Sequence, residues 1–324
     1  VRPRCNRWQK LLCLGCLQAG HAQELLMLDL AQPQSQLQPA LATAALRPPS
    51  KPMSKEEQLL RERQRQAHSG ITSFQLAAAA PVVLFPAGGS LWTAQLHPLP
   101  AVPSELPALA PGARIDPKLC PARAELVAFV RQDELWVAQG AQETRVSHET
   151  AQPGCKAGAP PYVIQEEFDR YTGHWWQPAA PGAQRVHVLF EAINEEHVAA
   201  ISIPEYTLSG GMDTYRYPRP GARNPTAELR LAELALDDHG VANVRLHSLP
   251  HKLAELFPWA EYLVRVGWRD PATIWIMLLN RTQTRLEIVT VPIAAFTAPT
   301  AADPAAFAAQ VLLPLFFFFF KTRK

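Results

Sequence analysis

The fold is decided by the stretch between residues 126 and 137, which reads Leu126-Val127-Ala128-Phe129-Val130-Arg131-Gln132-Asp133-Glu134-Leu135-Trp136-Val137. Two apolar runs rich in β-branched and aromatic residues stand on either side of a polar turn. Such residues are enriched in strands, and a short polar connection between two such runs is typical of an antiparallel hairpin. A third run, Thr144 to Val146, follows closely. The stretch therefore predicts a meander of short antiparallel strands.

Similar short runs recur along most of the chain. They are Ile71 to Leu76, Val82 to Phe85, Leu91 to Gln95, Arg185 to Phe190, His197 to Ile203, Val241 to Leu246, Tyr262 to Val266, Ile274 to Leu279 and Arg285 to Val291. Most of the 31 prolines fall between these runs, where a missing amide donor does little harm. This recurrence is typical of propeller blades. We predict an all-β fold, a partial β-propeller of four-stranded antiparallel blades, because the runs supply only about three or four blades.

A short helix is expected before the propeller. Ser54 and Glu57 form a capping box, and Glu57 and Arg61 have the spacing of a favourable helical ion pair. Only Leu59 and Leu60 are strongly apolar between residues 55 and 66, so this helix has little surface to bury and should be marginal. Residues 1–52 show no sustained period and are expected to form a poorly ordered N-terminal segment.

Composition excludes two classes of partner. The 324 residues carry 31 basic and 29 acidic side chains, a net charge of +2, which gives no field that would attract nucleic acid. The apolar run 311–320 has ten residues, about half of what a helix needs to span a bilayer. We therefore predict no nucleic-acid partner and no membrane partner.

The five cysteines make a poor disulfide framework, because their number is odd and three of them lie within the first sixteen residues. A reducing compartment is the simpler interpretation. Cys13 and Cys16 form a Cys-x-x-Cys pair with the spacing of a redox or metal site, but no second pair completes a zinc site. No metal and no cofactor are predicted.

The candidate site residues are Glu166 and Glu167, which open an aromatic segment ending at Trp175 and Trp176. Adjacent carboxylates suit a cationic group such as the ammonium of a peptide N-terminus, whose pKa is about 8. The alternative is a solvated acidic turn. Neighbours in a regular helix point about 100° apart, so the two acids can converge on one cation only near a helix end or turn. The aromatics can wall a pocket or pack in the core.

The segment Val163-Ile164-Gln165-Glu166-Glu167-Phe168-Asp169-Arg170-Tyr171 resembles the glutamate-bearing helix of the dipeptidyl peptidase IV family, most closely its intracellular members. Other stretches match that family in the same order. They include 54–65, Arg114-Ile115-Asp116-Pro117-Lys118-Leu119-Cys120-Pro121, Tyr215-Arg216-Tyr217-Pro218, Asn224-Pro225, Glu261-Tyr262, Gly267-Trp268 and 279–286. The resemblance covers residues 53–298, which would form the N-terminal propeller portion. Residues 299–324 form a divergent, low-complexity tail.

The resemblance implies roles for three residues. Glu166 and Glu167, on a short helical insertion, would bind the N-terminal ammonium of a substrate, and Arg65 would bind a substrate carbonyl. The substrates would be peptides with proline or alanine in second position, cleaved by a cytoplasmic serine-type dipeptidyl aminopeptidase. For Arg65 the alternative is an exposed helix charge.

The family's nucleophile lies in a Gly-x-Ser-x-Gly elbow of a later hydrolase domain, and the sequence contains no such elbow. We therefore expect no catalytic residue in this chain, which should be inactive alone, and a homodimer only if the hydrolase domain is present. Two other hypotheses remain open: a non-catalytic propeller binding module, and a truncated fragment without function.

Overall fold

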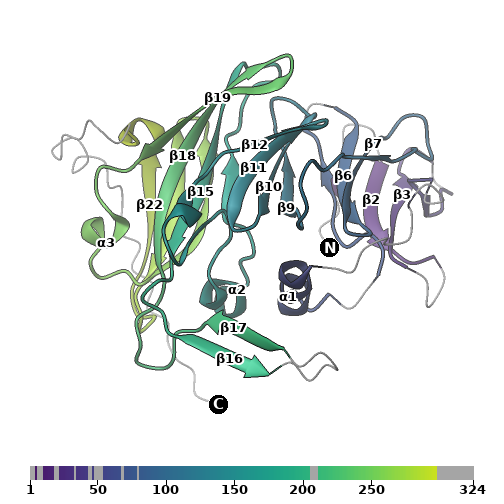
Figure 1. Cartoon of the computed structure of the whole chain (residues 1–324). Coiled ribbons are helices and arrows are strands. Elements are labelled where there is room, and N and C mark those ends of the chain that lie inside the picture. The colour runs from purple at the N-terminus through teal and green to yellow at the C-terminus, as the bar shows by residue number, and fades with distance from the viewer. Residues whose placement is uncertain are drawn as a thin grey trace. The chain divides into compact units, whose positions relative to one another are not determined.

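The computed structural model describes residues 4–5, 10–17, 22–32, 34–42, 46, 54–66, 69–78, 80–204 and 211–297. Its elements are mostly strands in antiparallel sheets (Figure 1). The chain divides into two compact units. The first consists of residues 1–132, 136–144 and 180–183, and the second of residues 133–135, 145–179 and 184–324. The tail expected over residues 299–324 lies outside the described residues.

Three four-stranded sheets follow one another along the first part of the chain, in the orders β1-β2-β3-β4, β5-β6-β7-β8 and β12-β11-β10-β9. Each strand therefore pairs with its neighbour in sequence, as expected for meanders joined by short turns. The strands are β1 Arg4–Cys5, β2 Lys10–Gly15, β3 Glu24–Asp29, β4 Gln38–Pro39, β5 Gln75–Leu76, β6 Val82–Ala87, β7 Ser90–Gln95, β8 Ser104–Glu105, β9 Ile115–Leu119, β10 Leu126–Arg131, β11 Glu134–Gln139 and β12 Gln142–Arg145.

The hairpin predicted from residues 126–137 is confirmed as β10 and β11. Its connection consists of Gln132 and Asp133, both with positive φ, at 51° and 60°. Two consecutive residues with positive φ are the mark of a type I′ turn, whose twist matches that of the flanking strands. All six residues of β10 are buried, so this strand is enclosed on both faces.

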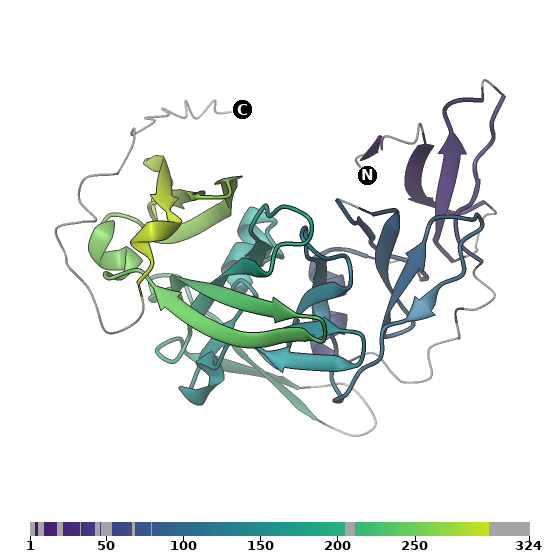
Figure 2. The same cartoon turned by 90° about the horizontal axis from the view of Figure 1, so that it is seen from above.

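The second unit contains a five-stranded sheet in which β13-β15-β18-β19 lie in order and β14 also pairs with β15. The long green strands β18 and β19 run side by side in Figures 1 and 2. A hairpin, β16-β17, and a three-stranded sheet, β20-β21-β22, follow. The strands are β13 Cys155–Ala157, β14 His174–Trp176, β15 Arg185–Asn194, β16 Ala200–Pro204, β17 Met212–Arg216, β18 Thr226–Asp237, β19 Gly240–Ser248, β20 Tyr262–Asp270, β21 Thr273–Leu279 and β22 Leu286–Pro292.

Helices are short and few among the described residues. The α-helices are α1 Lys55–Arg63, α2 Tyr162–Phe168 and α3 Leu253–Leu256, and the 3-10 turns are η2 Glu149–Ala151 and η3 Ile293–Ala295. None of these helices is long and apolar enough to cross a membrane.

Apolar residues from neighbouring sheets form the cores. In the first unit, one cluster joins β2 and β3 to β6 and β7, and another joins β6 and β7 to β9 and β10. In the second unit, a single cluster joins β15 and β18 to all three strands of the β20-β21-β22 sheet. Packing of one sheet against the next in sequence is how propeller blades bury their faces.

The structure describes two paired strands in the N-terminal region. Parts of residues 1–52 are ordered as β2 and β3, and Leu25, Leu26 and Met27 are all buried. The leucine-rich stretches there are short, and they gain order from pairing with each other and packing on β6 and β7. The short helix expected before the propeller strands from residue 71 onward is present as α1, which precedes β5 in the chain.

The chain is thus all-β and forms a partial β-propeller of antiparallel blades, with the glutamate-bearing helix α2 inserted between β13 and β14. The propeller boundaries at residues 53 and 298 stay predictions.

Candidate functional site

The helix α2 begins directly after two prolines, Pro160 and Pro161. Pro161 is its N-cap, with the extended φ and ψ of −68° and 163° that proline readily adopts. The buried side chain of Gln165 donates a hydrogen bond of 2.7 Å from Nε2 to the carbonyl oxygen of Pro160. This contact fixes the first turn of the helix on the chain that enters it.

The C-terminal end of α2 is irregular. Asp169 has the left-handed φ and ψ of 50° and 43°, and its N–H donates to the oxygen of Ile164, five residues back. The N–H of Arg170 donates to the same oxygen at 3.3 Å. The last turn, which carries Glu166 and Glu167, is therefore wider than an α-helical turn. An irregular end is what two adjacent acids need in order to approach one cation.

Both glutamates are exposed, and no ion pair or hydrogen bond joins either side chain to another described residue. The C-terminal end of a helix carries partial negative charge, so a carboxylate there costs about 0.3–1 kcal/mol. No basic residue lies in this last turn. Glu166 and Glu167 thus form a negative, solvent-accessible pair whose charge is open to a ligand.

The turn after α2 is held by Arg170, whose side chain is only 4% exposed. It forms a bidentate pair with Glu191 of β15, at 2.9 Å from Nη1 and 2.6 Å from Nη2. Its other donors bond the carbonyl oxygens of Val264 at 2.9 Å, Leu263 at 2.8 Å and Thr172 at 2.7 Å. All five N–H donors of the guanidinium are therefore used, and the turn is fixed to two different sheets.

A β-bulge in β20 makes these contacts possible. The pairing of β20 with β21 shifts register between Leu263 and Arg265. Successive carbonyls of a regular strand point in opposite directions, so Leu263 and Val264 can both accept from one guanidinium only where the strand is irregular. Arg265, the residue after the bulge, makes a further hydrogen bond, to the helix. Its Nη2 donates to the carbonyl oxygen of Phe168 at 2.6 Å. Phe168 is the last residue of α2.

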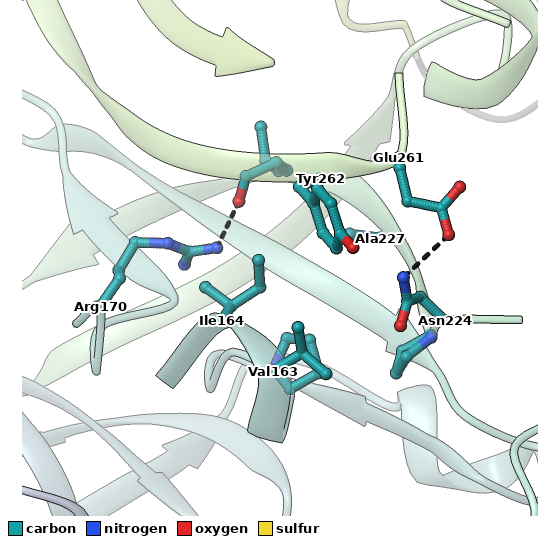
Figure 3. A pocket seen from close by; sticks show the side chains of 10 residues that line it. Val163, Ile164, Arg170, Asn224, Ala227, Glu261 and Tyr262 are labelled. Atoms are coloured by element: carbon teal, nitrogen blue, oxygen red, sulfur yellow. Dashed lines mark hydrogen bonds between the residues drawn. The ribbon is translucent and has the colours of Figure 1, made fainter. Parts of the chain in front are cut away.

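A pocket lies beside α2, between the helix and the start of β20 (Figure 3). Its empty volume is about 320 Å³ and includes open solvent. Glu261 accepts hydrogen bonds there from Asn224 at 2.8 Å and from Arg281 at 3.1 Å. The lining residues are Pro161, Val163, Ile164, Arg170, Asn224, Pro225, Ala227, Glu261, Tyr262 and Leu263.

The aromatic residues near α2 act mainly in packing. Trp176 is buried, and Trp175 packs against the core of the second unit. Phe168 lies against Tyr262, with ring centroids 5.2 Å apart. Tyr162 makes an edge contact with Tyr217 at 5.4 Å. Packing is one of the two roles that the sequence left open for these aromatics.

Arg65, the third predicted site residue, lies in the first unit at the end of α1. Ser54 caps the start of this helix by accepting from the N–H of Glu57 at 3.2 Å. At the other end, Arg65 has a positive φ of 53°, and the N–H of Gln66 donates to the oxygen of Arg61 at 2.9 Å. This bond closes a Schellman motif, whose left-handed position is usually glycine. Arg65 is exposed and has no side-chain partner among the described residues.

The charge of Glu57 also bears on α1. Burial raises the pKa of its carboxyl, against the lowering effect of Arg61. The helix therefore holds a partly buried acid that interacts with Arg61, as the spacing of the two residues predicts.

Sequence reasoning missed the residues that support the site. Arg170 belongs to the quoted motif, but the sequence around it does not indicate which residues it binds. Glu191 lies within an otherwise apolar strand, and no local pattern pairs it with Arg170. Arg265 is a charged residue inside the apolar run Tyr262 to Val266, which was the one available signal. Within the described ranges, no group of three or more His, Cys, Asp or Glu side chains has the geometry of a metal site.

The sequence is similar to known proteins over most of its length. The family model for the dipeptidyl peptidase IV (DPP IV) N-terminal region matches residues 87–303. The human protein dipeptidyl peptidase 8 is 33% identical over 257 residues, which cover 73% of this chain and 29% of that protein. Dipeptidyl peptidase 8 of Mus musculus is 32% identical over the same lengths. The match thus spans less than a third of these relatives. The chain belongs to the dipeptidyl peptidase IV family, within its N-terminal region.

Proposed function

We propose that this chain is the substrate-recognition portion of a cytoplasmic serine-type dipeptidyl aminopeptidase, which releases Xaa-Pro or Xaa-Ala dipeptides from peptide N-termini. In this proposal Glu166 and Glu167 bind the substrate ammonium, and Arg65 binds a substrate carbonyl. Cleavage belongs to a hydrolase domain with its own nucleophile, since recognition by carboxylates orients a peptide without cleaving it.

The observation that carries the proposal is the pair of exposed carboxylates, which have no side-chain partner within the described part of the chain and lie at a helix end held by Arg170 and Arg265. Hydrogen bonds between charged groups contribute about 1.5–3 kcal/mol each, which is enough to select a free N-terminus over an acylated one. An exposed ion pair that is free to move contributes far less. The fixed turn after α2 therefore matters, because it limits the entropy that the glutamates lose on binding.

The role of Arg65 is supported by its backbone. A non-glycine residue in the left-handed region costs about 1–2 kcal/mol. The Schellman bonds from the N–H groups of Arg65 and Gln66 offset part of this cost, but no side-chain hydrogen bond or ion pair of Arg65 does so among the described residues. An arginine kept at such a position is explained if its side chain serves a ligand.

Binding to the chain itself is tested with a matched pair of peptides that begin Gly-Pro, one with a free N-terminus and one acetylated. We expect the chain to bind only the free peptide measurably, by NMR or calorimetric titration. Glu166→Gln and Glu167→Gln should each weaken binding by about tenfold or more, as loss of one charged hydrogen bond implies. Glu196→Gln, which changes an exposed glutamate of the same unit, is the control. Equal binding of both peptides would reject the ammonium site.

Activity is tested by joining residues 1–297 to the part of human dipeptidyl peptidase 8 that follows its matched region, because β2 and β3 share a core with β6 and β7. The fusion should release Gly-Pro from a chromogenic substrate, and the glutamate variants should lower this rate strongly. Unchanged rates in those variants would reject the assigned roles even if the fusion is active.

A further inference from the structure

We propose that Arg265 is a positioning residue, which holds the end of α2 so that Glu166 and Glu167 face one ammonium. This inference rests on the proposed function, because it concerns the same glutamate pair. Among the described residues Arg265 donates hydrogen bonds to main-chain oxygens only, so its effect on a peptide would act through the helix.

The first step in the argument is the bond to α2. Arg265 Nη2 donates to the carbonyl oxygen of Phe168 at 2.6 Å. Phe168 directly follows Glu167, and its carbonyl is one of the terminal groups that the helix leaves without an internal partner. The bond therefore fixes the peptide plane next to the glutamate pair. Asp169, the next residue, has a left-handed conformation, which Asp tolerates better than most residues, and the bond to Phe168 helps to hold it.

The second step concerns charge. Arg265 also donates from Nη1 to the oxygen of Val264 at 3.0 Å, and no carboxylate pairs with Arg265 among the described residues. Its positive charge is thus not neutralised by an ion pair, and it lies at the negative end of a helix that also carries two acids. A cation there is favourable. One guanidinium against two carboxylates still leaves the helix end negative, as an ammonium site requires.

The third step is the origin of the arrangement. Arg265 directly follows the β-bulge at Val264. The carbonyl oxygens of Leu263 and Val264 both accept hydrogen bonds from Arg170. Bulges redirect a side chain relative to the strand. Arg170 thus fixes the turn from inside the sheet while Arg265 fixes the last residue of the helix. Two arginines with different partners hold the same helix end.

A purely structural role predicts something different. If Arg265 only stabilises the fold, its loss should lower stability and leave the preference for a free N-terminus unchanged in the protein that remains folded. A positioning role predicts that this preference falls in the folded protein. The two roles are separated by comparing peptide binding with folding in the same samples.

The test uses the full chain with Arg265→Met, Arg265→Lys and, as a control, Arg230→Met. Arg230 is a half-buried arginine of the same unit that faces Glu149 at 3.7 Å. We expect R265M to weaken binding of the free Gly-Pro peptide about tenfold or more, since small misplacements have large effects on recognition. R265K keeps a donor and a charge and should recover most of the loss. R230M should bind like the parent.

Amide exchange over α2 gives a second, ligand-free measurement. R265M should speed exchange of the Asp169 and Arg170 amides at least tenfold, and R230M should not. Parent-like peptide affinity in folded R265M, or unchanged exchange at these amides, would overturn the positioning role. If the parent chain does not discriminate the free from the acetylated peptide, the proposed function fails, while the exchange result still decides whether Arg265 holds the helix.

Discussion

Replacing Arg170 by methionine should destabilise the second unit strongly. Glu191 is fully buried, at 0% exposure, and its carboxylate accepts two N–H bonds from Arg170. The substitution leaves a buried carboxylate without its cation and removes donors from three carbonyl oxygens. Loss of one partner of a buried ion pair costs about 3–5 kcal/mol. We expect a decrease of that size in the free energy of unfolding.

The double variant Arg170→Met with Glu191→Met sharpens this prediction. Replacing both charges by apolar side chains removes the desolvation cost of the pair, so the double variant should recover most of the stability. The carbonyl oxygens of Leu263 and Thr172 would still lack the donor that Arg170 gives them, which limits the recovery, whereas Val264 keeps its bond from Arg265 at 3.0 Å. A strongly non-additive cycle is therefore expected.

The measurement is urea-dependent amide exchange at Gly158 and Glu191, because their N–H groups donate to Glu191 and Gly173 within this unit, both at 2.9 Å. Exchange at these two amides measures the stability of this part of the structure, so the whole chain need not unfold in one cooperative transition. A loss below about 1 kcal/mol in R170M, or additive losses in the double variant, would refute the reasoning.

Three further predictions concern single residues. Ser54→Ala should cost α1 about 1 kcal/mol, seen as faster exchange of the Glu57 amide, because no residue of that helix is buried; unchanged exchange would show that the cap is dispensable. Arg65→Gly should stabilise α1 by about 1 kcal/mol by relieving the left-handed strain while weakening peptide binding, and a loss of helix protection would contradict this. The pKa of His187 is lowered by burial, against the raising effect of Glu233 and with a further lowering by His247. Its folded pKa is below the unfolded value of about 6.5, so stability should fall as the pH decreases from that value. His187→Gln should flatten this part of a pH-dependent unfolding curve, and an identical curve would exclude His187 as the cause.

The strands with a clear alternating or β-branched pattern could be predicted from the sequence, and β18 could not. Residues 226–237 read Thr-Ala-Glu-Leu-Arg-Leu-Ala-Glu-Leu-Ala-Leu-Asp, which is rich in good helix formers. In the structure this segment is a central strand, paired with β15 over ten residues and with β19 on its other side. Leu229, Leu231 and Leu234 are buried in the sheet. Long-range pairing thus overrides local propensity here.

The candidate site likewise has one feature that the sequence predicts and one that it does not. The need for an irregular helix end follows from the spacing of Glu166 and Glu167 alone, and the left-handed Asp169 meets it. The bond from Arg265 to Phe168 spans 97 residues of sequence. It depends on a register shift between two strands, which no local pattern encodes.

The bulge in β20 makes the glutamate helix depend on the exact residue count of a distant strand. Loops accept insertions easily, but adding or removing one residue between Leu263 and Arg265 would reverse the facing of every side chain on one side of the change. The guanidinium of Arg265 would then leave the helix end, and the paired carbonyls would no longer converge on Arg170. If α2 were grafted onto another blade, its C-terminal turn would lose these hydrogen bonds unless the bulged segment 263–265 of β20 were grafted with it.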